Sequence, residues 1–455
     1  MPEPIASPDV LLHAGQYNIS HLELISPDLV IKLHDIFMEL NVFESILTPV
    51  MSMSILLTDT NNLTTNMPII GEEVLNVGFN VPSIDGAVPD STDNFQFQIY
   101  SLKNRKPTKD RAQIFTLHGM SIEYFMAEEK KVFRCYNGKK GEFIVKDIID
   151  NIVEVDRDLV IKDGTLTNIN CTIPGWSPFD AIDWVSNRCI SGKTGAVNYV
   201  FYESIRDGFV FGSIAELMSR EPVAKLKYHV VDQTSDTPVE EKLFIIESYE
   251  VINSFNTVES ASRGLVGNKL ITHDLVTKNI SEYEYDGIDE WNSGNHVGEF
   301  PPLNKKGTDS INFGSDSEIN RMVHPKHSQL MEGMQSDNLS ELWKMQRTSQ
   351  MEQLNGSFRI RVAMPGNTVI SAGDIVIFDL PSMEALEPGK TQDLPDEMKS
   401  GRYLVLNVRH IIKRDVYKMI LELVKDGNEV SIVGDRQFLQ QRLSPQNFNP
   451  SSIFF

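Results

Sequence analysis

Strand-like runs at both ends of the chain constrain its fold more than any other feature. Toward the amino end, apolar and polar residues partly alternate, which predicts strands, at residues 19–25, 29–40 and 50–57. Toward the carboxyl end, four runs are joined by turn-type sequence and occupy residues 358–364, 374–380, 403–412 and 416–424. The sequence therefore predicts two antiparallel β-rich units, one near each end of the chain.

Between the two β-rich units the sequence predicts helices. Ser177 and Pro178 form the clearest helix start, because serine suits the N-cap and proline the first helical position. Apolar residues three and four apart predict helix over residues 141–152, and residues 244–264 are also expected to be helical. A capping box at residues 338–341 predicts one more helix.

The strongest turn signal lies in the middle of the chain. Asp207 and Gly208 separate two alternating aromatic runs, residues 198–205 and 209–214. An Asp-Gly pair in this position is typical of a tight β-hairpin turn. The sequence predicts a hairpin here.

These signals divide the chain into five expected parts. Residues 284–336 are rich in Gly, Asn, Asp and Ser without sustained periodicity, which is typical of a functional loop or an insertion. The expected parts are a first tube-like β domain at residues 1–93, an α+β domain with the hairpin at 94–218, a helical and loop insertion region at 219–336, a second tube-like β domain at 337–425, and a C-terminal arm at 426–455.

Charge and cysteine content narrow the function classes. The 455 residues include 63 acidic and 42 basic side chains, a formal net charge of −21, which argues against a general binder of nucleic acid or membrane surfaces. The three cysteines are widely spaced and fit neither a disulfide framework nor a structural zinc site, so a reducing compartment is expected. No apolar stretch is long enough to span a bilayer, and no signal peptide is evident, so we expect a soluble, unprocessed chain.

The most suggestive nucleotide motif is incomplete. Residues 191–194 read Ser-Gly-Lys-Thr, the end of a phosphate-binding loop, but that pattern needs glycine where this chain has Asn187. A helix is expected before the motif and a strand after it, the reverse of the order that aims backbone amides at phosphate. We interpret the segment as a helix stop and turn.

Two segments of the long loop carry potential metal ligands. His324 and His327 are close in sequence, but no further ligand is apparent, so they are interpreted as surface residues. Asp286, Asp289 and Glu290 lack the alternating spacing and central glycine of a calcium loop and are interpreted as a solvated acidic turn.

The remaining candidates also favour structural roles. Glu72 and Glu73 are adjacent, so on a strand they would point to opposite faces and could not share one substrate. Cys171 and Cys189 flank the capped helix and are interpreted as core thiols, and Trp176, Phe179 and Trp184 as packed core. The sequence predicts no catalytic, cofactor-binding or metal-binding residue and no cofactor, a pattern that favours an assembly protein.

Three segments resemble the central baseplate hub proteins of contractile-tailed bacteriophages, which are related to the base of type VI secretion spikes. The first combines residues 59–63 with 68–79, and the second combines 174–184 with the hairpin at 199–211. The third combines residues 371–381 with 400–410. The resemblance spans about residues 17–425 in the same order as in the family, although residues 284–336 and the tail do not match its pattern.

The resemblance implies an α+β fold with two tube-protein-like antiparallel β-barrel domains and α/β insertions. It implies a homotrimeric, pseudo-sixfold ring that joins the hexameric tail tube to the threefold central spike. The expected partners are the spike and the tube or tube-initiator protein, with tape-measure and wedge proteins as further candidates. DNA would pass through the lumen without specific binding, and the net negative charge suits such a lumen.

The location implied is the virion tail baseplate, assembled in the host cytoplasm. On this reading the chain is a structural protein and not an enzyme. Two alternatives stay open from the sequence. One is a tail-associated peptidoglycan-degrading enzyme whose site is too dispersed to recognise, and the other is a solitary cytoplasmic enzyme.

Overall fold

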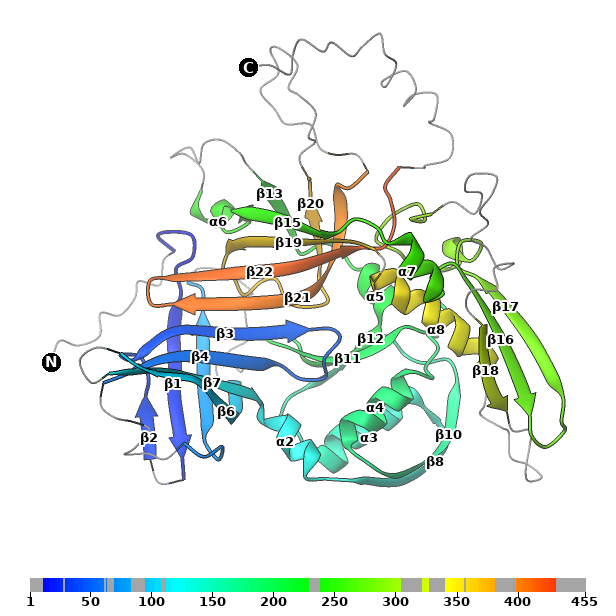
Figure 1. The fold of residues 1–455 in the computed structure, drawn as a ribbon, viewed down its shortest axis with the longest axis horizontal. Helices are drawn as coiled ribbons and strands as arrows, with labels where there is room; N and C mark the ends of the chain where they lie inside the picture. Colours follow the sequence, from blue (N-terminus) through cyan, green and yellow to red (C-terminus); the bar gives the residue numbers. More distant parts are fainter. Residues whose placement is uncertain are drawn as a thin grey trace, which may run out of the picture.

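The protein is β-rich with shorter helices, and most of its strands belong to one large sheet (Figure 1). The computed structural model describes residues 11–27, 29–60, 63, 69–82, 95–108, 112–228, 238–303, 321–326, 340–355, 357–380, 396 and 398–430. Within this part the large sheet has 14 strands, and three smaller sheets of two or three strands lie beside it. The predicted α+β character is confirmed.

The amino-terminal half of the large sheet is built from seven strands. They are β1 (Asn18–Ser26), β2 (Leu29–Lys32), β3 (Phe37–Ser45), β4 (Ser52–Asp59), β5 (Val74–Asn80), β6 (Phe95–Pro107) and β7 (Gln113–Ser121). Their order in space is β3-β4-β7-β6-β5-β1-β2, and every pair is antiparallel. Alternate residues of β4 are buried, as a strand with one face on a core requires.

One expected strand of this half is two strands. The run at residues 29–40 is broken by a turn, in which the Phe37 amide donates to the Leu33 carbonyl at 2.9 Å. Leu33 and Phe37 are both buried in the amino-terminal core, so the chain turns between two core positions and continues in a new strand. The expectation of a single strand was wrong.

The carboxyl-terminal half of the sheet also has seven strands. They are β13 (Ala224–Tyr228), β14 (Ile245–Ile246), β15 (Ser248–Asn253), β19 (Phe358–Pro365), β20 (Ile375–Phe378), β21 (Gly401–Lys413) and β22 (Val416–Lys425). The four strands predicted near the end of the chain are present, and the other three come from the middle of the chain. We call the two halves the amino unit (β1–β7) and the carboxyl unit (β13–β15 with β19–β22).

Strand β21 joins the two units. Its residues 401–404 pair with β20, and its residues 407–413 pair with β3 of the amino unit. Its other edge pairs with β22 and shows a shift in register between Val405 and Asn407. One strand therefore serves both halves of the sheet, and its irregularity lies where it passes from one to the other.

The helix expected over residues 244–264 is largely absent. The segment forms β14, β15 and only a short helix, α7 (Thr257–Ser262). Its β-branched residues suit a strand, and pairing of β14 with β13 and of β15 with β19 decides the conformation. A separate small sheet follows, made of β16 (Gly267–Asp274), β17 (Ile280–Asp286) and β18 (Arg321–Lys326).

The described part of the loop expected at residues 284–336 contains regular secondary structure. It contains the end of β17, the 3₁₀ turn η4 (Trp291–Ser293) and β18. The absence of periodicity concealed these short elements. Residues 304–320 and 327–336 of this loop lie outside the described residues.

A mixed α/β region links the two units. It contains α2 (Ile122–Glu128), β8 (Val132–Lys140), α3 (Gly141–Ile148), the π-helical turn η3 (Ile149–Val153), β9 (Leu159–Ile161), β10 (Asn168–Trp176), α4 (Pro178–Ser186), β11 (Tyr199–Ser204), β12 (Gly208–Ser213) and α5 (Ile214–Met218). The predicted α4 start is confirmed, because the Ser177 hydroxyl accepts a hydrogen bond from the Asp180 amide. Strands β8 and β10 form a two-stranded ribbon that curves past α3 and α4 (Figure 1).

One buried apolar cluster is centred on each of these three regions, and the clusters of the two β units also take residues from neighbouring regions. The expected boundary at residue 93 falls between β5 and β6, which pair with each other within the amino unit. The five-part division itself stays a prediction. The remaining helices are α6 (Val239–Lys242) and α8 (Ser340–Asn355), the latter near the capping box expected at 338–341. Within the described residues, no helix is long and apolar enough to cross a membrane, and of the expected C-terminal arm only residues 426–430 are described.

Candidate assembly site at the hairpin junction

The phosphate-loop-like segment forms a turn between α4 and β11. The Ser191 hydroxyl accepts hydrogen bonds from the amides of Lys193 and Thr194, at 3.1 and 3.0 Å. The Lys193 ammonium pairs with Glu216 at 2.8 Å. The backbone amides of Lys193 and Thr194 and the Lys193 ammonium, which a phosphate would need, therefore already have partners within the protein.

The candidate metal ligands do not converge. His324 lies on β18, 6.5 Å from the Trp343 ring between centroids, and His327 lies outside the described residues. The Asp286 carboxylate accepts the amides of Ile288 and Asp289, at 3.0 and 3.1 Å, and closes a turn. Among the residues that the structure describes, no group of three His, Cys, Asp or Glu could hold a metal ion.

The paired acids and the buried thiol have structural surroundings. Glu72 is exposed, whereas Glu73 is buried and accepts the amides of Ile70 and Gly71, so the two carboxylates face different surroundings, as expected. Both precede β5 rather than lying on it. Burial raises the pKa of the Cys189 thiol well above its ordinary value, which suits an inert core residue.

The aromatic stripe beside α4 belongs to packed structure. Phe179 is buried, and the rings of Trp176 and Trp184 lie 5.8 Å apart between centroids. The Arg188 guanidinium stacks 3.7 Å from the Trp184 ring. Phe179 belongs to the buried core, as expected, whereas Trp176 and Trp184 are partly buried and pack against it.

The predicted hairpin is present and occupies the centre of the molecule. Strands β11 and β12 pair antiparallel over their whole length, from Tyr199 with Ser213 to Ser204 with Gly208. Gly208 has a φ of +71°, and a Cβ there would lie 2.8 Å from the Asp158 carbonyl oxygen. Only glycine meets both conditions without strain, which explains the Asp-Gly turn.

Glu203 ties the hairpin to the amino unit. Its buried carboxylate accepts a hydrogen bond from the Met51 amide at 2.8 Å and another from the Ser121 hydroxyl at 2.5 Å. Arg157 donates to its other oxygen and forms an ion pair. Burial raises the pKa of Glu203 to about 7, although Arg157 acts in the opposite direction.

A second buried chain of hydrogen bonds links both units to the hairpin. Glu44 of β3 accepts from the Ile205 amide at 3.1 Å and lies 2.7 Å from His410 Nε2. His410 Nδ1 lies 2.6 Å from the Tyr417 hydroxyl, which donates to the Asn367 carbonyl at 2.9 Å. Glu44, His410 and Tyr417 are all buried, so this chain of hydrogen bonds is shielded from water.

Arg206 ties the hairpin to the carboxyl unit. Its guanidinium binds the Asp374 carboxylate in a bidentate pair, at 2.6 and 2.8 Å, and donates to the Val369 carbonyl at 2.9 Å. Asp374 is buried, so this pair is shielded from water on one side. Asp207, the next residue, pairs with Lys162 of the α/β region at 2.9 Å.

We call this set of contacts the hairpin junction: Glu203, Ile205, Arg206 and Asp207 with their partners in the amino unit, the carboxyl unit and the α/β region. Sequence reasoning located the hairpin but missed its role. The signal that was present is the run of charged residues, Glu203, Arg206 and Asp207, within an otherwise aromatic hairpin.

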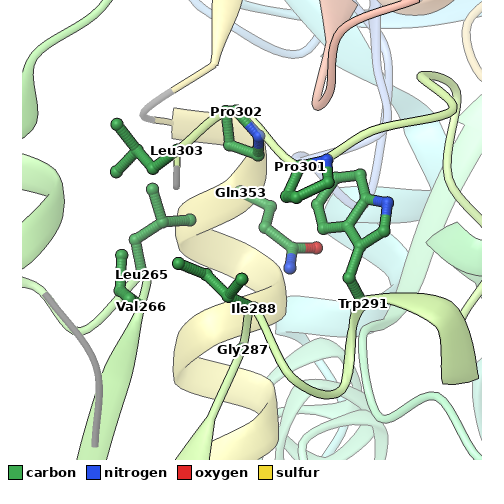
Figure 2. Close-up of a pocket in the computed structure, with 9 residues that line it drawn as sticks. All are labelled: Leu265, Val266, Gly287, Ile288, Trp291, Pro301, Pro302, Leu303 and Gln353. Atoms are coloured by element: carbon green, nitrogen blue, oxygen red, sulfur yellow. The ribbon is translucent and has the colours of Figure 1, made fainter. Parts of the chain in front are cut away.

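A small pocket lies beside α8 (Figure 2). Apolar side chains form most of its wall, and the Gln353 amide projects from α8 between Ile288 and Trp291. Trp291 stacks on His296 at 3.6 Å between ring centroids, and His296 Nδ1 lies 2.7 Å from an Asp426 oxygen. None of the nine lining residues is titratable, so this pocket offers no acid or base.

Comparisons with known proteins agree with the resemblance seen in the sequence. A probable baseplate hub protein of Vibrio phage KVP40 is 24% identical over 322 residues, which cover 67% of this chain and 71% of that protein. The resemblance to baseplate hub proteins is confirmed. No family model matches the chain.

The fold also resembles that of a solved tail protein. The tail protein from Neisseria meningitidis MC58 superimposes with a TM-score of 0.53 at 14% identity, over 90% of this chain and 97% of that one. A 43 kDa tail protein of prophage MuSo2 from Shewanella oneidensis gives a TM-score of 0.49 at 8% identity, over 90% and 100% of the two chains. The first of these likenesses shows a shared tail-protein fold.

Proposed function

We propose that this chain is a structural, non-enzymatic subunit of a phage baseplate hub, located in the virion tail. In this role it is a homotrimeric adaptor that joins the hexameric tail tube to the threefold central spike and lines the DNA channel. The observation that carries the proposal is the similarity to a probable baseplate hub protein over 67% of the chain.

The two β units suit a subunit that contributes two similar domains to a ring. The amino and carboxyl units each contain seven strands, and β21 of the carboxyl unit also pairs with β3 of the amino unit. Three chains would then supply six units around an axis, which matches a sixfold tube on one side and a threefold spike on the other. We propose that residues 1–93 and 337–425 form most of the two tube-like domains, and that residues 94–218 and 219–336 are insertions.

Pairings in the carboxyl unit favour a barrel. Around the unit they run β13-β20-β21-β22-β19-β15. The segment that contains β14 and β15 is nearly continuous, because β14 pairs with β13 and β15 pairs with β19. The Glu247 amide between them donates to the Ala363 carbonyl of β19 at 2.8 Å. We propose that this segment closes the unit as a barrel.

The ends of the large sheet suit contacts between copies. Strand β2 is one end, and Leu29 and Val30 on it are about half exposed. On β15, within the segment proposed to close the carboxyl unit, Val251 and Ile252 are also exposed. Open strand edges with apolar side chains are sites of association, and a closed ring of identical subunits would cover them.

The charge of the chain suits passage of DNA. At −21 per chain, a trimer would repel phosphate wherever acidic side chains face the lumen. We therefore propose a channel that DNA crosses without specific binding. A map of the assembled ring with a neutral or basic bore would contradict this part of the proposal.

Native mass spectrometry of the 51.4 kDa chain tests the central claim. We expect a trimer, either alone or once spike and tube subunits are added. Val30→Lys on β2 is expected to reduce the trimer, whereas Val323→Lys on β18, also an exposed valine but outside the large sheet, is the control. A monomer or dimer in every mixture would refute the adaptor role.

The spike and the tube or tube-initiator protein are the proposed partners, and tape-measure and wedge proteins are further candidates. Assembly in the host cytoplasm is part of the same proposal. No specific observation favours the peptidoglycan-degrading alternative, and zymography on cell-wall material is expected to show no clearing.

A further inference from the structure

The β8–β10 ribbon is a basic surface on an acidic protein. Residues 130–140 and 168–176 contain five Lys or Arg and no Asp or Glu, although the whole chain carries −21. All the cations lie on or just before β8, since β10 has no charged residue. The concentration of one charge sign on a single ribbon is a local feature that needs its own explanation.

Three of these cations have no carboxylate partner. Lys130 pairs with Glu154 at 2.9 Å, and Lys140 lies 4.0 Å from Glu142. Within the described part of the chain, no Asp or Glu oxygen lies within ion-pair distance of Lys131, Arg134 or Lys139, and all three are exposed. Their charge is therefore available to an anionic partner.

An exposed aromatic ring is fixed beside these cations. Phe133 is 75% exposed, and a Cβ on Gly175 of β10 would lie 2.6 Å from the tip of its ring. Because Gly175 has no side chain, the Phe133 ring can rest against its backbone. Lys139 lies 4.7 Å from the centroid of another half-exposed ring, Phe143 of α3.

One face of the ribbon packs on the core, and in the described structure the outer edge of each of its strands has no strand paired to it. Val132, Tyr136, Ile169 and Ile173 point into the core that also contains α3 and α4. In the described structure, β8 and β10 pair only with each other, so each leaves one edge without a strand. An open edge presents backbone donors and acceptors to an incoming strand.

We propose that this ribbon binds an acidic, extended segment of a partner protein, which adds a strand to the open edge of β8 or β10. Lys131, Arg134 and Lys139 would pair with its acidic side chains, and Phe133 would cover an apolar one. This mode supplies affinity through main-chain hydrogen bonds and specificity through side chains. The proposal does not depend on the trimeric ring, and each can fail without the other.

Two observations favour a polypeptide over nucleic acid. The open strand edges offer alternating N–H and C=O groups, which another peptide strand satisfies and a phosphate backbone does not. The cations are also confined to one short ribbon, and the acidic remainder of the chain would repel a long polyanion such as duplex DNA.

Fluorescence anisotropy with the full chain tests the proposal. The probe is a short fluorescein-labelled peptide of alternating glutamate and valine, at low salt. Arg134→Glu/Lys139→Glu is expected to weaken binding by about tenfold or more, because it reverses two charges at the surface. Phe133→Ser is expected to weaken it as well. The matched control, Lys103→Glu/Lys106→Glu on exposed β6, is expected to leave binding unchanged.

A second probe separates strand addition from simple charge attraction. The same peptide with every internal backbone nitrogen methylated keeps its charge but loses the hydrogen-bond donors of both strand edges, so it is expected to bind much more weakly. Equal binding of both peptides would overturn strand addition. Failure of the unmodified peptide to bind, or tighter binding of a labelled DNA duplex that is lost in Arg134→Glu/Lys139→Glu, would overturn the proposal. Circular dichroism confirms that the variants are folded.

Discussion

The bidentate pair between Arg206 and Asp374 gives the sharpest test of the hairpin junction. Arg206→Met removes the two charge-assisted hydrogen bonds to Asp374, at 2.6 and 2.8 Å, together with the bonds to the Val369 carbonyl and to Asp207, and leaves the Asp374 carboxylate without its cation. Asp374 keeps one bond, from the Ser371 amide at 2.9 Å. The side chain of Asp374 is only 3% exposed, so water can replace the lost guanidinium poorly.

The expected loss of stability follows from this geometry. Removing one partner of a buried ion pair typically costs about 3–5 kcal/mol. The Arg206 side chain is 24% exposed, so water enters from that side and offsets part of the loss. We therefore expect Arg206→Met to lower the free energy of unfolding by about 3 kcal/mol, toward the lower end of that range.

Urea unfolding, followed by circular dichroism and by tryptophan fluorescence, measures the change. Arg206→Lys keeps the charge but not the two-pronged geometry, and is expected to cost about half as much. Arg206→Met/Asp374→Asn removes both charges while the Asn oxygen can still accept from Ser371, so it is expected to recover at least about 1 kcal/mol. A double variant as unstable as the sum of the two single variants would refute the reasoning.

Three further predictions concern other buried sites. Burial raises the pKa of Glu203 from 4.5 to about 7, so in that interval the folded protein holds a proton that the unfolded chain has released. The stability that protonated Glu203 contributes is present at low pH and is lost as pH rises through about 7. Glu203→Gln should therefore remove the corresponding decline in melting temperature between pH 4.5 and 7. An unchanged decline in the variant would contradict this assignment to Glu203. A Cβ on Gly366 would lie 2.2 Å from the ring of buried Tyr417, so Gly366→Ala should cost about 1–3 kcal/mol in urea unfolding, and a neutral result would be inconsistent with this packing. In the native protein a thiol reagent should label exposed Cys135 quickly, whereas buried Cys189 should react only after unfolding. Equal labelling rates for the two thiols would contradict the burial of Cys189.

Local signals in the sequence were sufficient where a few neighbouring residues decide the structure. Ser177 begins α4 because its own hydroxyl satisfies the helix terminus, and Gly208 closes the hairpin because its backbone needs a left-handed conformation. Residues 244–264 gave the wrong prediction because β14 and β15 depend on pairing with β13 and β19, which are distant in sequence. Such pairing overrides local preference.

The contacts of the hairpin junction could not be predicted from the sequence for a similar reason. Glu44 and Ile205 are 161 residues apart, and Arg206 and Asp374 are 168 residues apart. A single sequence shows that these residues are charged or polar but contains no signal that they meet. The similarity to hub proteins was recognisable because it depends on the order of short motifs, which does not require knowledge of these contacts.

The ion pair between Arg206 and Asp374 is also expected to fix the angle between the amino unit and the carboxyl unit. In the described structure, the two β units of the large sheet are joined by the pairing of β21 with β3, and the register shift of β21 between Val405 and Asn407 is a natural point of bending. Near that point the hairpin binds the amino unit through Glu203 and the carboxyl unit through Arg206. A closed ring requires a fixed angle between successive units, because a small error in each unit opens the ring.

Replacing the pair with less polar side chains should therefore separate stability from assembly. In the proposed ring, Arg206→Met/Asp374→Asn is expected to regain part of its stability and still yield fewer closed trimers by native mass spectrometry, since directional bonds at 2.6 and 2.8 Å no longer set the orientation. Lys162→Met, which removes the Lys162–Asp207 pair at 2.9 Å but leaves the hydrogen bonds of Arg206 in place, is the control. If the double variant forms trimers as completely as the wild type, the pair contributes stability alone and β21 sets the angle.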